Sequence, residues 1–301
     1  MSLRELRAVP GSIVGRLAPT PSGRLHLGNV CAAGAAWLSV RQRGGRLLLR
    51  IEDVDAGRAR RDIADDIRAD LDWLGLTCDA ETPPQSARDY TPALARLAPH
   101  TYRCGCTRAA SREAGGACVA ACRSRGLTDG AIRFALPAGV ETIVDRALGQ
   151  STVDLATLPD PVLQRRDGCA TYTLAVVADD IADGVTEVAR GADLADQSAV
   201  QAVLWRALGA EPPAWLHAPL ILGGDGKKLS KSHRAAAVGD LRALGWSAGD
   251  IWRTVLPWLG LAPFPAVHGG AAVADGPAML HHALPAFEAT RIPRGPFTWV
   301  L

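Results

Sequence analysis

A strand–helix–strand unit near the amino terminus constrains the fold more than any other feature of the sequence. Ser12 to Ala18 predicts a strand, and Asn29 to about Gln42 predicts a helix, with Asn29 as its N-cap and Gly44 as its stop. The run RLLLRI, from Arg46 to Ile51, is typical of a buried parallel strand. Such units alternate in α/β folds with a doubly wound, Rossmann-type parallel sheet, whose ligands bind at the carboxyl ends of the strands.

The junction between this strand and this helix, GRLAPTPSGRLHLGNV, suits an anion. A helix N-terminus that follows a strand presents free N–H groups and a partial positive charge. Gly28 allows a phosphate or a flat ring to approach the backbone, and His26 can donate a hydrogen bond to a phosphate oxygen. A lone histidine before a helix is more often a loop residue without function, so this interpretation depends on a second motif farther along the chain.

Lysine is confined to one short loop. The chain has 33 Lys and Arg residues together, yet its lysines are Lys227, Lys228 and Lys231, all within GDGKKLSKS. A solvated surface loop is one explanation. The other is a need for a compact ammonium on a flexible stem, where the planar fork of Arg would not serve, and the use of Arg everywhere else in the chain favours it.

The odd number of cysteines, seven, argues against a disulfide framework. Two close pairs stand in one short segment: Cys104, Cys106, Cys118 and Cys122. Four thiolates at this spacing suit a tetrahedral site without an open position, which predicts a structural Zn²⁺. Four free thiols in an Arg-rich loop are the alternative.

The length of 301 residues suggests two domains. We expect a catalytic domain over residues 1–232, an irregular insertion at about 100–165 that carries the cysteines, and a small, mainly helical region over 233–301. Hydrophobic spacing predicts helices at Ala59–Leu74, Ser198–Leu208, Ala235–Leu244 and Ala248–Leu259, and a strand at Thr171–Val177.

The net charge of +2 gives no strong global attraction to nucleic acid, so any RNA contact must come from local basic patches. The first residues lack the apolar segment of a signal peptide, and the longest apolar run, Val30–Leu38, is too short to span a bilayer. We therefore expect a cytoplasmic protein that does not bind membranes, and a monomer.

Two motifs resemble those of the class I aminoacyl-tRNA synthetases. HLGN, residues 26–29, resembles the HIGH motif, and KLSKS, residues 228–232, resembles the KMSKS motif. RLAPTPSGRLHLG followed by RIEDVD is similar to the glutamyl and glutaminyl branch of that class. The resemblance covers roughly residues 12–232, and although HLGN alone is weakly specific, the three motifs in this order are specific together.

This resemblance implies a class I synthetase fold and the ATP-dependent activation of L-glutamate to glutamyl-adenylate, with Mg²⁺ accompanying ATP. The barrier is largely one of charge and positioning, so the site needs preorganised donors rather than a nucleophile. Catalytic positions of the family match His26, Gly28, Asn29, Lys228 and Lys231, and ATP-binding positions match His26, Gly28, Lys228, Ser230 and Lys231. Glutamate-binding positions match Arg16, Thr20, Glu52, Tyr172 and Arg190, of which Glu52 would hold the α-amino group.

The region after Ser232 is too short for the anticodon-binding domain of conventional glutamyl-tRNA synthetases. The chain therefore resembles the glutamyl-queuosine tRNA(Asp) synthetases, which attach glutamate to the queuosine base in the anticodon of tRNA(Asp). A zinc site is also expected of that family, although Cys118 stands where its members often have Tyr. Alternatives are a shortened conventional glutamyl-tRNA synthetase, a non-catalytic, zinc-stabilised RNA-binding paralogue, and a small-molecule adenylyl transferase.

Overall fold

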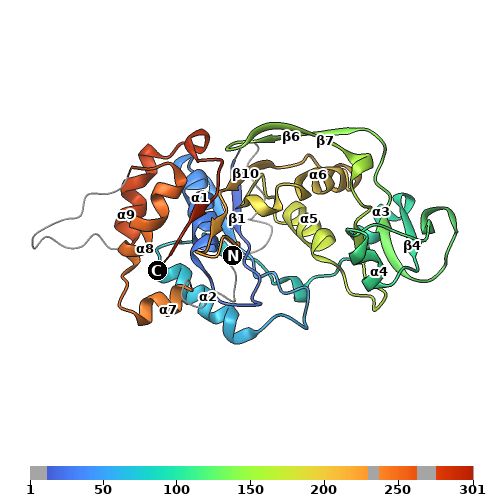
Figure 1. The fold of residues 1–301 in the computed structure, drawn as a ribbon, viewed down its shortest axis with the longest axis horizontal. Coiled ribbons are helices and arrows are strands. Elements are labelled where there is room, and N and C mark those ends of the chain that lie inside the picture. The colour runs from blue at the N-terminus through green and yellow to red at the C-terminus, as the bar shows by residue number, and fades with distance from the viewer. Residues whose placement is uncertain (1–11, 230–236, 263–275, 301) are drawn as a thin grey trace, which may run out of the picture.

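The predicted strand–helix–strand unit forms the centre of the molecule in the computed structural model, which describes residues 12–229, 237–262 and 276–300 (Figure 1). It consists of β1 (Val14–Leu17), α1 (Leu27–Gln42) and β2 (Arg46–Leu49). β1 and β2 pair in parallel, and β3 (Ala80–Glu81) pairs in parallel with the other edge of β2. The predicted α/β class with a parallel sheet is confirmed.

Helix α1 begins earlier than predicted. His26 occupies the N-cap, and Asn29 lies in the first turn, where its side-chain oxygen accepts a hydrogen bond from the backbone N–H of His26 over 3.1 Å. The prediction that Asn29 is the N-cap was therefore wrong, because its side chain bonds back to the cap residue, as in a capping box. The helix ends as predicted, at Gln42, with Gly44 at a φ of +64°.

A second sheet has the strand order β7-β6-β10-β9. Its members are β6 (Val140–Asp145), β7 (Gly149–Asp154), β9 (Glu187–Gly191) and β10 (Ala214–Ala218). β10 pairs in parallel with both β9 and β6, whereas β6 and β7 form an antiparallel hairpin. The backbone N–H of Thr186 donates to the carbonyl of Val14 over 2.8 Å, so the start of β9 lies against β1 and the two sheets are contiguous.

Helix α5 (Tyr172–Ala182) stands where the sequence predicted a strand over Thr171–Val177, and that prediction was wrong. Leu174 to Val177 are consecutive buried apolar residues, and such a run fits a buried strand or a buried helix equally well. Contacts with distant parts of the chain favour the helix, among them the ion pairs that Asp180 forms with Arg16 and Arg50.

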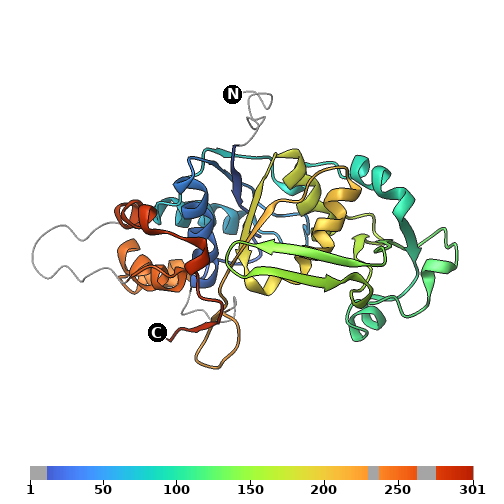
Figure 2. The ribbon, with the colours of Figure 1, turned by 90° about the horizontal axis from the view of Figure 1, so that it is seen from above.

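The region between the two sheets is more regular than predicted. After α3 (Thr91–Leu97), a small antiparallel sheet has the order β4-β5-β8, formed by β4 (Thr101–Cys104), β5 (Ala131–Phe134) and β8 (Val162–Gln164), and α4 (Arg108–Glu113) follows β4. The β6–β7 hairpin extends along the molecule as an edge of the second sheet (Figure 2). The expectation of irregular structure missed the alternation in VETIVD, whose residues are exposed and buried in turn.

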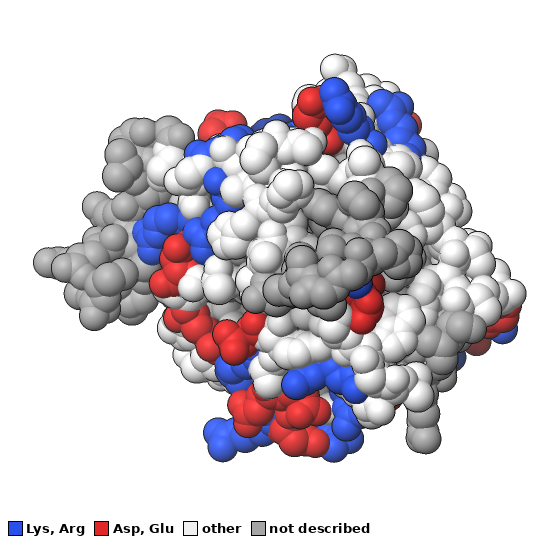
Figure 3. Space-filling model, turned by 90° about the vertical axis from the view of Figure 1, so that its left-hand side faces the viewer, with Lys and Arg blue, Asp and Glu red and all other residues white. Residues whose placement is uncertain are grey.

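The carboxy-terminal helices pack on α1 at one end of the molecule (Figure 1). The helices predicted from the sequence are confirmed as α2 (Arg61–Trp73), α6 (Gln197–Ala207), α7 (Val238–Ala243) and α8 (Ala248–Val255). A further helix, α9 (Gly276–Ala283), was not predicted. A Cβ on Gly34 of α1 would lie 2.9 Å from the ring of Trp252, which shows how closely α8 approaches α1. Acidic and basic side chains are intermingled on the surface of this end (Figure 3).

The chain's last described strand returns to the lysine-containing loop. β12 (Phe297–Thr298) pairs in parallel with β11 (Ile221–Leu222), which is followed by Gly223 and then by GDGKKLS. None of the helices in the described ranges is both long and apolar enough to cross a membrane.

Candidate active site and cysteine cluster

A cavity of about 880 Å³ opens where β1, β9 and β10 end at their carboxyl edges. It is lined by every predicted substrate and catalytic residue that the structure describes: Arg16, Thr20, His26, Gly28, Asn29, Glu52, Tyr172, Arg190 and Lys228. Ser230 and Lys231 lie outside the described residues. The tertiary structure thus brings residues from three separate sequence motifs to one cavity.

The HLGN motif forms the N-terminus of α1 on the cavity wall. His26 is buried, and a Cβ on Gly28 would lie 3.0 Å and 3.1 Å from two atoms of its imidazole ring. A side chain at position 28 would therefore displace the imidazole, so the glycine is needed for close approach rather than for an unusual backbone conformation. The free N–H groups of this helix end can receive an anion.

The lysine loop lies beside the same helix end. Lys228 lines the cavity, and its ammonium forms an ion pair with the carboxylate of Asp193, just after β9. Before the segment 230–236, the N–H of Leu229 bonds to the carbonyl of Ile221; after it, Ala237 forms a backbone bridge with His26. The later flank is thus bridged directly to HLGN, and Ile221, the partner of the earlier flank, lies beside Gly28.

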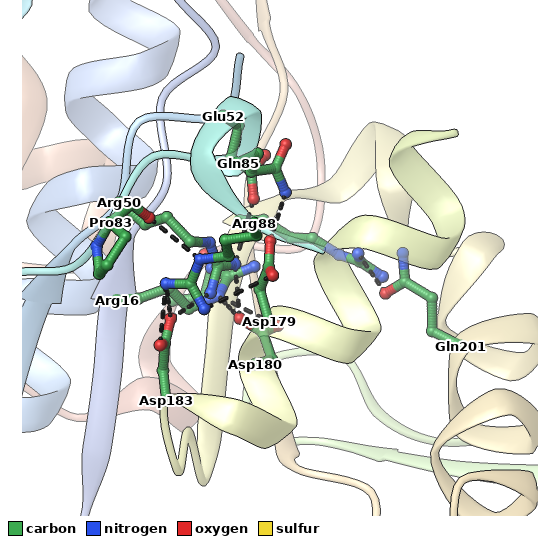
Figure 4. A network of polar contacts seen from close by, with 12 residues as sticks. Arg16, Arg50, Glu52, Pro83, Gln85, Arg88, Asp179, Asp180, Asp183 and Gln201 are labelled. Carbon is green, nitrogen blue, oxygen red and sulfur yellow. Dashed lines mark hydrogen bonds and ion pairs between the residues drawn. The ribbon is translucent and has the colours of Figure 1, made fainter. Parts of the chain in front are cut away.

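An arginine–carboxylate network forms the floor of the cavity (Figure 4). Arg50 is fully buried, and its guanidinium donates to Glu52 over 3.2 Å, to Asp180 over 2.6 Å and to Asp183 over 3.0 Å. The Nε atom of Arg16 donates to Asp180 over 3.2 Å. The network therefore fixes Arg16 and Glu52, two of the predicted glutamate-binding residues, relative to each other.

The carboxylates of this network differ in their proton affinity. Burial raises the pKa of Glu52 above its usual value, although Arg50 and Arg16 oppose the shift. Burial also acts to raise the pKa of Asp180, but Arg16 and Arg50 together hold it below its usual value. At Asp180 the two arginines thus outweigh burial, whereas at Glu52 burial outweighs the arginines.

A second layer of the network holds Asp179. Its carboxylate accepts hydrogen bonds from the Gln85 amide over 2.9 Å and from the Tyr90 hydroxyl over 3.0 Å, and Arg88 joins it from the same segment (Figure 4). The sequence analysis did not select Arg50, Asp179 or Asp180. The available signals were an arginine inside the apolar run RLLLRI and an acidic pair inside VVADDIA, because buried charges of this kind need partners.

Arg190 contributes a buried cation to the opposite wall. Its side chain is 6% exposed and donates to His217 over 3.1 Å, and it also donates to Gln201, Ser198 and the carbonyl of Leu194. Within the described part of the chain it forms no ion pair with a carboxylate. Burial is the main cause that lowers its pKa. A buried cation without a counter-charge is costly, so this wall is suited to an anionic ligand group.

Tyr172 lines the same cavity from the start of α5, within electrostatic reach of Glu52 and Arg190. Burial, followed by the nearby charge of Glu52, raises its pKa to about 12. The hydroxyl therefore stays protonated and available as a hydrogen-bond donor. Together the cavity offers an anion-binding wall and a buried carboxylate, an arrangement that fits a zwitterion with an additional carboxylate.

The four predicted cysteines come together beyond β4, on the small antiparallel sheet. Their Sγ atoms all lie within 4.8 Å of one another, and Cys118 is 3.7 Å from both Cys104 and Cys106. In a tetrahedral site with Zn–S bonds of about 2.3 Å, the sulfurs are about 3.8 Å apart. The cluster therefore fits a zinc ion. These distances are too long for disulfides.

Local backbone structure shapes the cluster. Ala121, the residue before Cys122, adopts a φ of +45°, and the N–H of Cys122 donates to the sulfur of Cys118 over 3.3 Å. Burial opposes the ionisation of Cys118, but this N–H and neighbouring donors lower its pKa to about 7. A thiolate at this position is what a metal ligand requires.

Comparisons with known proteins agree with this geometry. Residues 12–114 and 121–253 match the family of class I tRNA synthetases (E and Q), catalytic domain. The chain is 42% identical over 289 residues to Glutamyl-Q tRNA(Asp) synthetase of Xanthomonas campestris pv. campestris (strain 8004), with 93% of each chain covered. It is 38% identical over 318 residues to the protein of the same name from Symbiobacterium thermophilum, with 94% of this chain and 95% of that one covered.

A solved structure supports the same assignment. Glutamate-tRNA synthetase from Elizabethkingia anophelis superimposes with a TM-score of 0.75 and 25% identity, over 96% of this chain and 68% of that one. Fold and cavity thus define a ligase of the class I aminoacyl-tRNA synthetase type, of the glutamate and glutamine branch. Within that branch, the identity over nearly the whole length shows that the chain belongs to the glutamyl-Q tRNA(Asp) synthetase family.

Proposed function

We propose that the protein uses ATP to activate L-glutamate as glutamyl-adenylate and transfers the glutamyl group to queuosine in the anticodon of tRNA(Asp). The observation that carries the amino-acid specificity is the placement of opposite charges in the cavity. Arg190 is a buried cation without an acidic partner in the described chain, and Glu52 is a buried carboxylate whose pKa is raised by burial. The side-chain carboxylate of glutamate would supply a counter-charge to Arg190, and its α-ammonium would add a second cation beside Glu52, which already pairs with Arg50.

Arg16 and Tyr172 would complete the recognition of glutamate. The Nε and one Nη atom of Arg16 are used by Asp180 and the carbonyl of Ala189, while its other Nη group makes no hydrogen bond within the described chain. That group can therefore donate to a substrate carboxylate, and the hydroxyl of Tyr172 can donate beside it. Thr20 lies at the exposed rim of the same cavity.

The other end of the cavity is suited to ATP. The N-terminus of α1, with His26 and Gly28, would receive phosphate oxygens, and Asn29 holds the cap residue in place. Lys228 can exchange its partner Asp193 for a phosphate, and Ser230 and Lys231 would act from the same loop. Mg²⁺, bound with ATP, would neutralise part of the phosphate charge. The attack on the α-phosphorus then needs positioning and charge stabilisation rather than a protein nucleophile.

The acceptor assignment rests on relatives named Glutamyl-Q tRNA(Asp) synthetase, which match this chain over nearly their whole length. In this proposal the anticodon loop enters the active site, and a cyclopentene hydroxyl of queuosine attacks the adenylate. Basic residues around the cysteine cluster would contact the phosphates of the loop: Arg103, Arg108, Arg112, Arg123 and Arg125. Of these, Arg108 also lines the cavity.

The test is to load labelled glutamate onto purified tRNA(Asp) with and without queuosine, and onto tRNA(Glu). The proposal expects label only on queuosine-containing tRNA(Asp), resistant to removal of the 3′ adenosine. Glutamate-dependent ATP–pyrophosphate exchange is expected without any tRNA. Label that leaves with the 3′ adenosine, or that loads tRNA(Glu), would instead identify a shortened conventional glutamyl-tRNA synthetase.

A further inference from the structure

We propose that Asp145 and His217 are positioning residues that orient Arg190 and thereby set the affinity of the amino-acid site. The inference rests on the proposed function, because it assigns Arg190 to the carboxylate of the substrate. Neither Asp145 nor His217 lies among the residues that the sequence motifs singled out. His217 does not line the cavity at all, so its effect on the substrate must pass through Arg190.

The three side chains form a continuous buried chain of hydrogen bonds. Arg190 on β9 and His217 on β10 are direct neighbours in the parallel register, and the Nε atom of Arg190 lies 3.1 Å from Nε2 of His217. The Nδ1 atom of His217 lies 2.6 Å from the carboxylate of Asp145 on β6. Because His217 is only 1% exposed, water does not compete for either of its ring nitrogens.

The geometry dictates which ring nitrogen carries the proton. The Nε group of arginine can only donate, so Nε2 of His217 must accept. An ionised carboxylate can only accept, so Nδ1 must donate. Both constraints select the same neutral tautomer, with the proton on Nδ1. If the proton moved to Nε2, two donors would face each other, and Arg190 would lose its hydrogen bond to His217.

Asp145 is held ionised and in place by the turn of its own hairpin. Its other carboxylate oxygen accepts the N–H groups of Ala147 over 2.8 Å and Leu148 over 2.7 Å. Burial acts to raise its pKa, but His217 and these N–H groups bring the pKa below its usual value. The β6–β7 hairpin is thereby coupled to the amino-acid site.

The remaining contacts of Arg190 explain why one hydrogen bond matters. Its guanidinium carbon lies 4.8 Å from the ring centre of Trp215, and its Nη groups donate to Gln201, Ser198 and the carbonyl of Leu194. These groups bind the outer edges of the guanidinium, whereas His217 holds the Nε edge and sets the rotation of the plane. These contacts use four of the five N–H groups of Arg190, so one N–H on the Nη atom that binds Gln201 is left for a substrate carboxylate, and its direction follows the orientation of the plane.

Asp145→Asn is the sharpest variant, because it reverses the tautomer while the turn keeps its acceptor. The amide oxygen can still accept from Ala147 and Leu148, so the NH₂ group faces Nδ1 of His217 and turns Nδ1 into an acceptor. Nε2 then carries the proton and opposes Arg190. We expect the KM for glutamate in pyrophosphate exchange to rise about tenfold to a hundredfold, by analogy with the loss caused when a residue that orients a metal ligand is removed. The KM for ATP should stay within about twofold, because the substitution disturbs the amino-acid subsite and leaves the binding of ATP unchanged.

Two substitutions at position 217 separate orientation from simple packing. His217→Gln can place its amide oxygen near the position of Nε2 and retain the acceptor for Arg190, whereas His217→Asn reaches only toward Asp145. The proposal expects the glutamine variant to keep a near-normal KM for glutamate and the asparagine variant to resemble Asp145→Asn. Thr186→Val is the control, because it removes a hydrogen bond with Val14 next to β9 without a contact to Arg190.

A spectroscopic readout is independent of activity. Nitrogen-15 NMR of histidine-labelled full-length protein should show His217 neutral with the proton on Nδ1, and on Nε2 in Asp145→Asn. A proton on Nε2 in the unmodified protein, or an unchanged KM for glutamate in both Asp145→Asn and His217→Asn, would overturn the inference. Arg190→Ala tests the proposed function separately from this inference. If it leaves the KM for glutamate unchanged, the proposed amino-acid site is wrong, whatever the tautomer of His217.

Discussion

The guanidinium of Arg50 on the segment after β2 donates to the carboxylate of Asp180 on α5 over 2.6 Å, and both side chains are buried. The contact joins residues 130 positions apart and places α5 against the first sheet. Arg16 shares the same carboxylate. The floor of the amino-acid site is therefore part of the structural core.

We expect Asp180→Asn to lower the free energy of unfolding by about 3–5 kcal/mol, because it leaves two buried arginines with too little negative charge. The measurement is chemical denaturation at neutral pH. Asp62→Asn is the control, since Asp62 pairs with Arg60 on the surface and its loss should hardly change stability. Because the folded-state pKa of Asp180 is lowered, its stabilisation is present above the unfolded-state pKa of about 3.9 and is lost as the pH falls through the lower folded-state value.

Glu52→Gln should separate activity from stability. We expect the KM for glutamate to rise by about 10²-fold, through loss of a buried charge partner for the α-ammonium. The raised pKa of Glu52 means that its ionised form costs folding energy above that pKa, and this cost diminishes as the pH falls. The variant should therefore be at least as stable as the unmodified protein at neutral pH. A marked loss of stability with normal kinetics would assign Glu52 a structural role instead.

The lysine loop offers a matched pair of variants. Lys228 lines the cavity and pairs with Asp193, whereas its neighbour Lys227 is exposed and does not line the cavity. Lys228→Ala should reduce the rate of pyrophosphate exchange by about 10²–10³, the usual effect of removing one preorganised charge contact, while Lys227→Ala should have little effect. Lys231→Ala is predicted to behave like Lys228→Ala. Equal rates in all variants with normal circular dichroism would remove the loop from the mechanism.

Metal analysis should find one Zn²⁺ per chain, lost when Cys104, Cys106, Cys118 and Cys122 are replaced by serine. Loss of the metal should expose the segment around α4 to proteases, because a closed site contributes folding energy. Arg108, at the start of α4, lines the cavity mouth, so transfer to tRNA should fall more than pyrophosphate exchange. Cys169→Ser, an exposed thiol outside the cluster, is the control. Full transfer activity in metal-free protein would contradict the assignment.

A large part of this structure could be predicted from short segments of the sequence. The β1–α1–β2 unit, the amphipathic helix α2 and the cysteine cluster depend on spacings within short segments, where side-chain periodicity or ligand spacing directly reports the geometry. Gly28 was also identified, although the structure gives it an additional reason, the proximity of the His26 ring. These features could be predicted because neighbours in sequence are neighbours in space.

The tertiary structure decided what local spacing leaves open. The run that became α5 is compatible with a strand or a helix, and the carboxylate of Asp180, 164 residues from Arg16 and 130 from Arg50, favours the helix by meeting both guanidiniums. Likewise, His217 is 27 residues from Arg190 and 72 from Asp145, and nothing in its sequence surroundings indicates a role. A buried charge needs a partner, but its sequence neighbours do not say which one, because partners are chosen by the register of strands and the packing of helices. The α/β class, the motifs and the cysteine cluster could therefore be predicted from local spacing, whereas the buried groups that hold the arginines in place depend on how distant segments pack together.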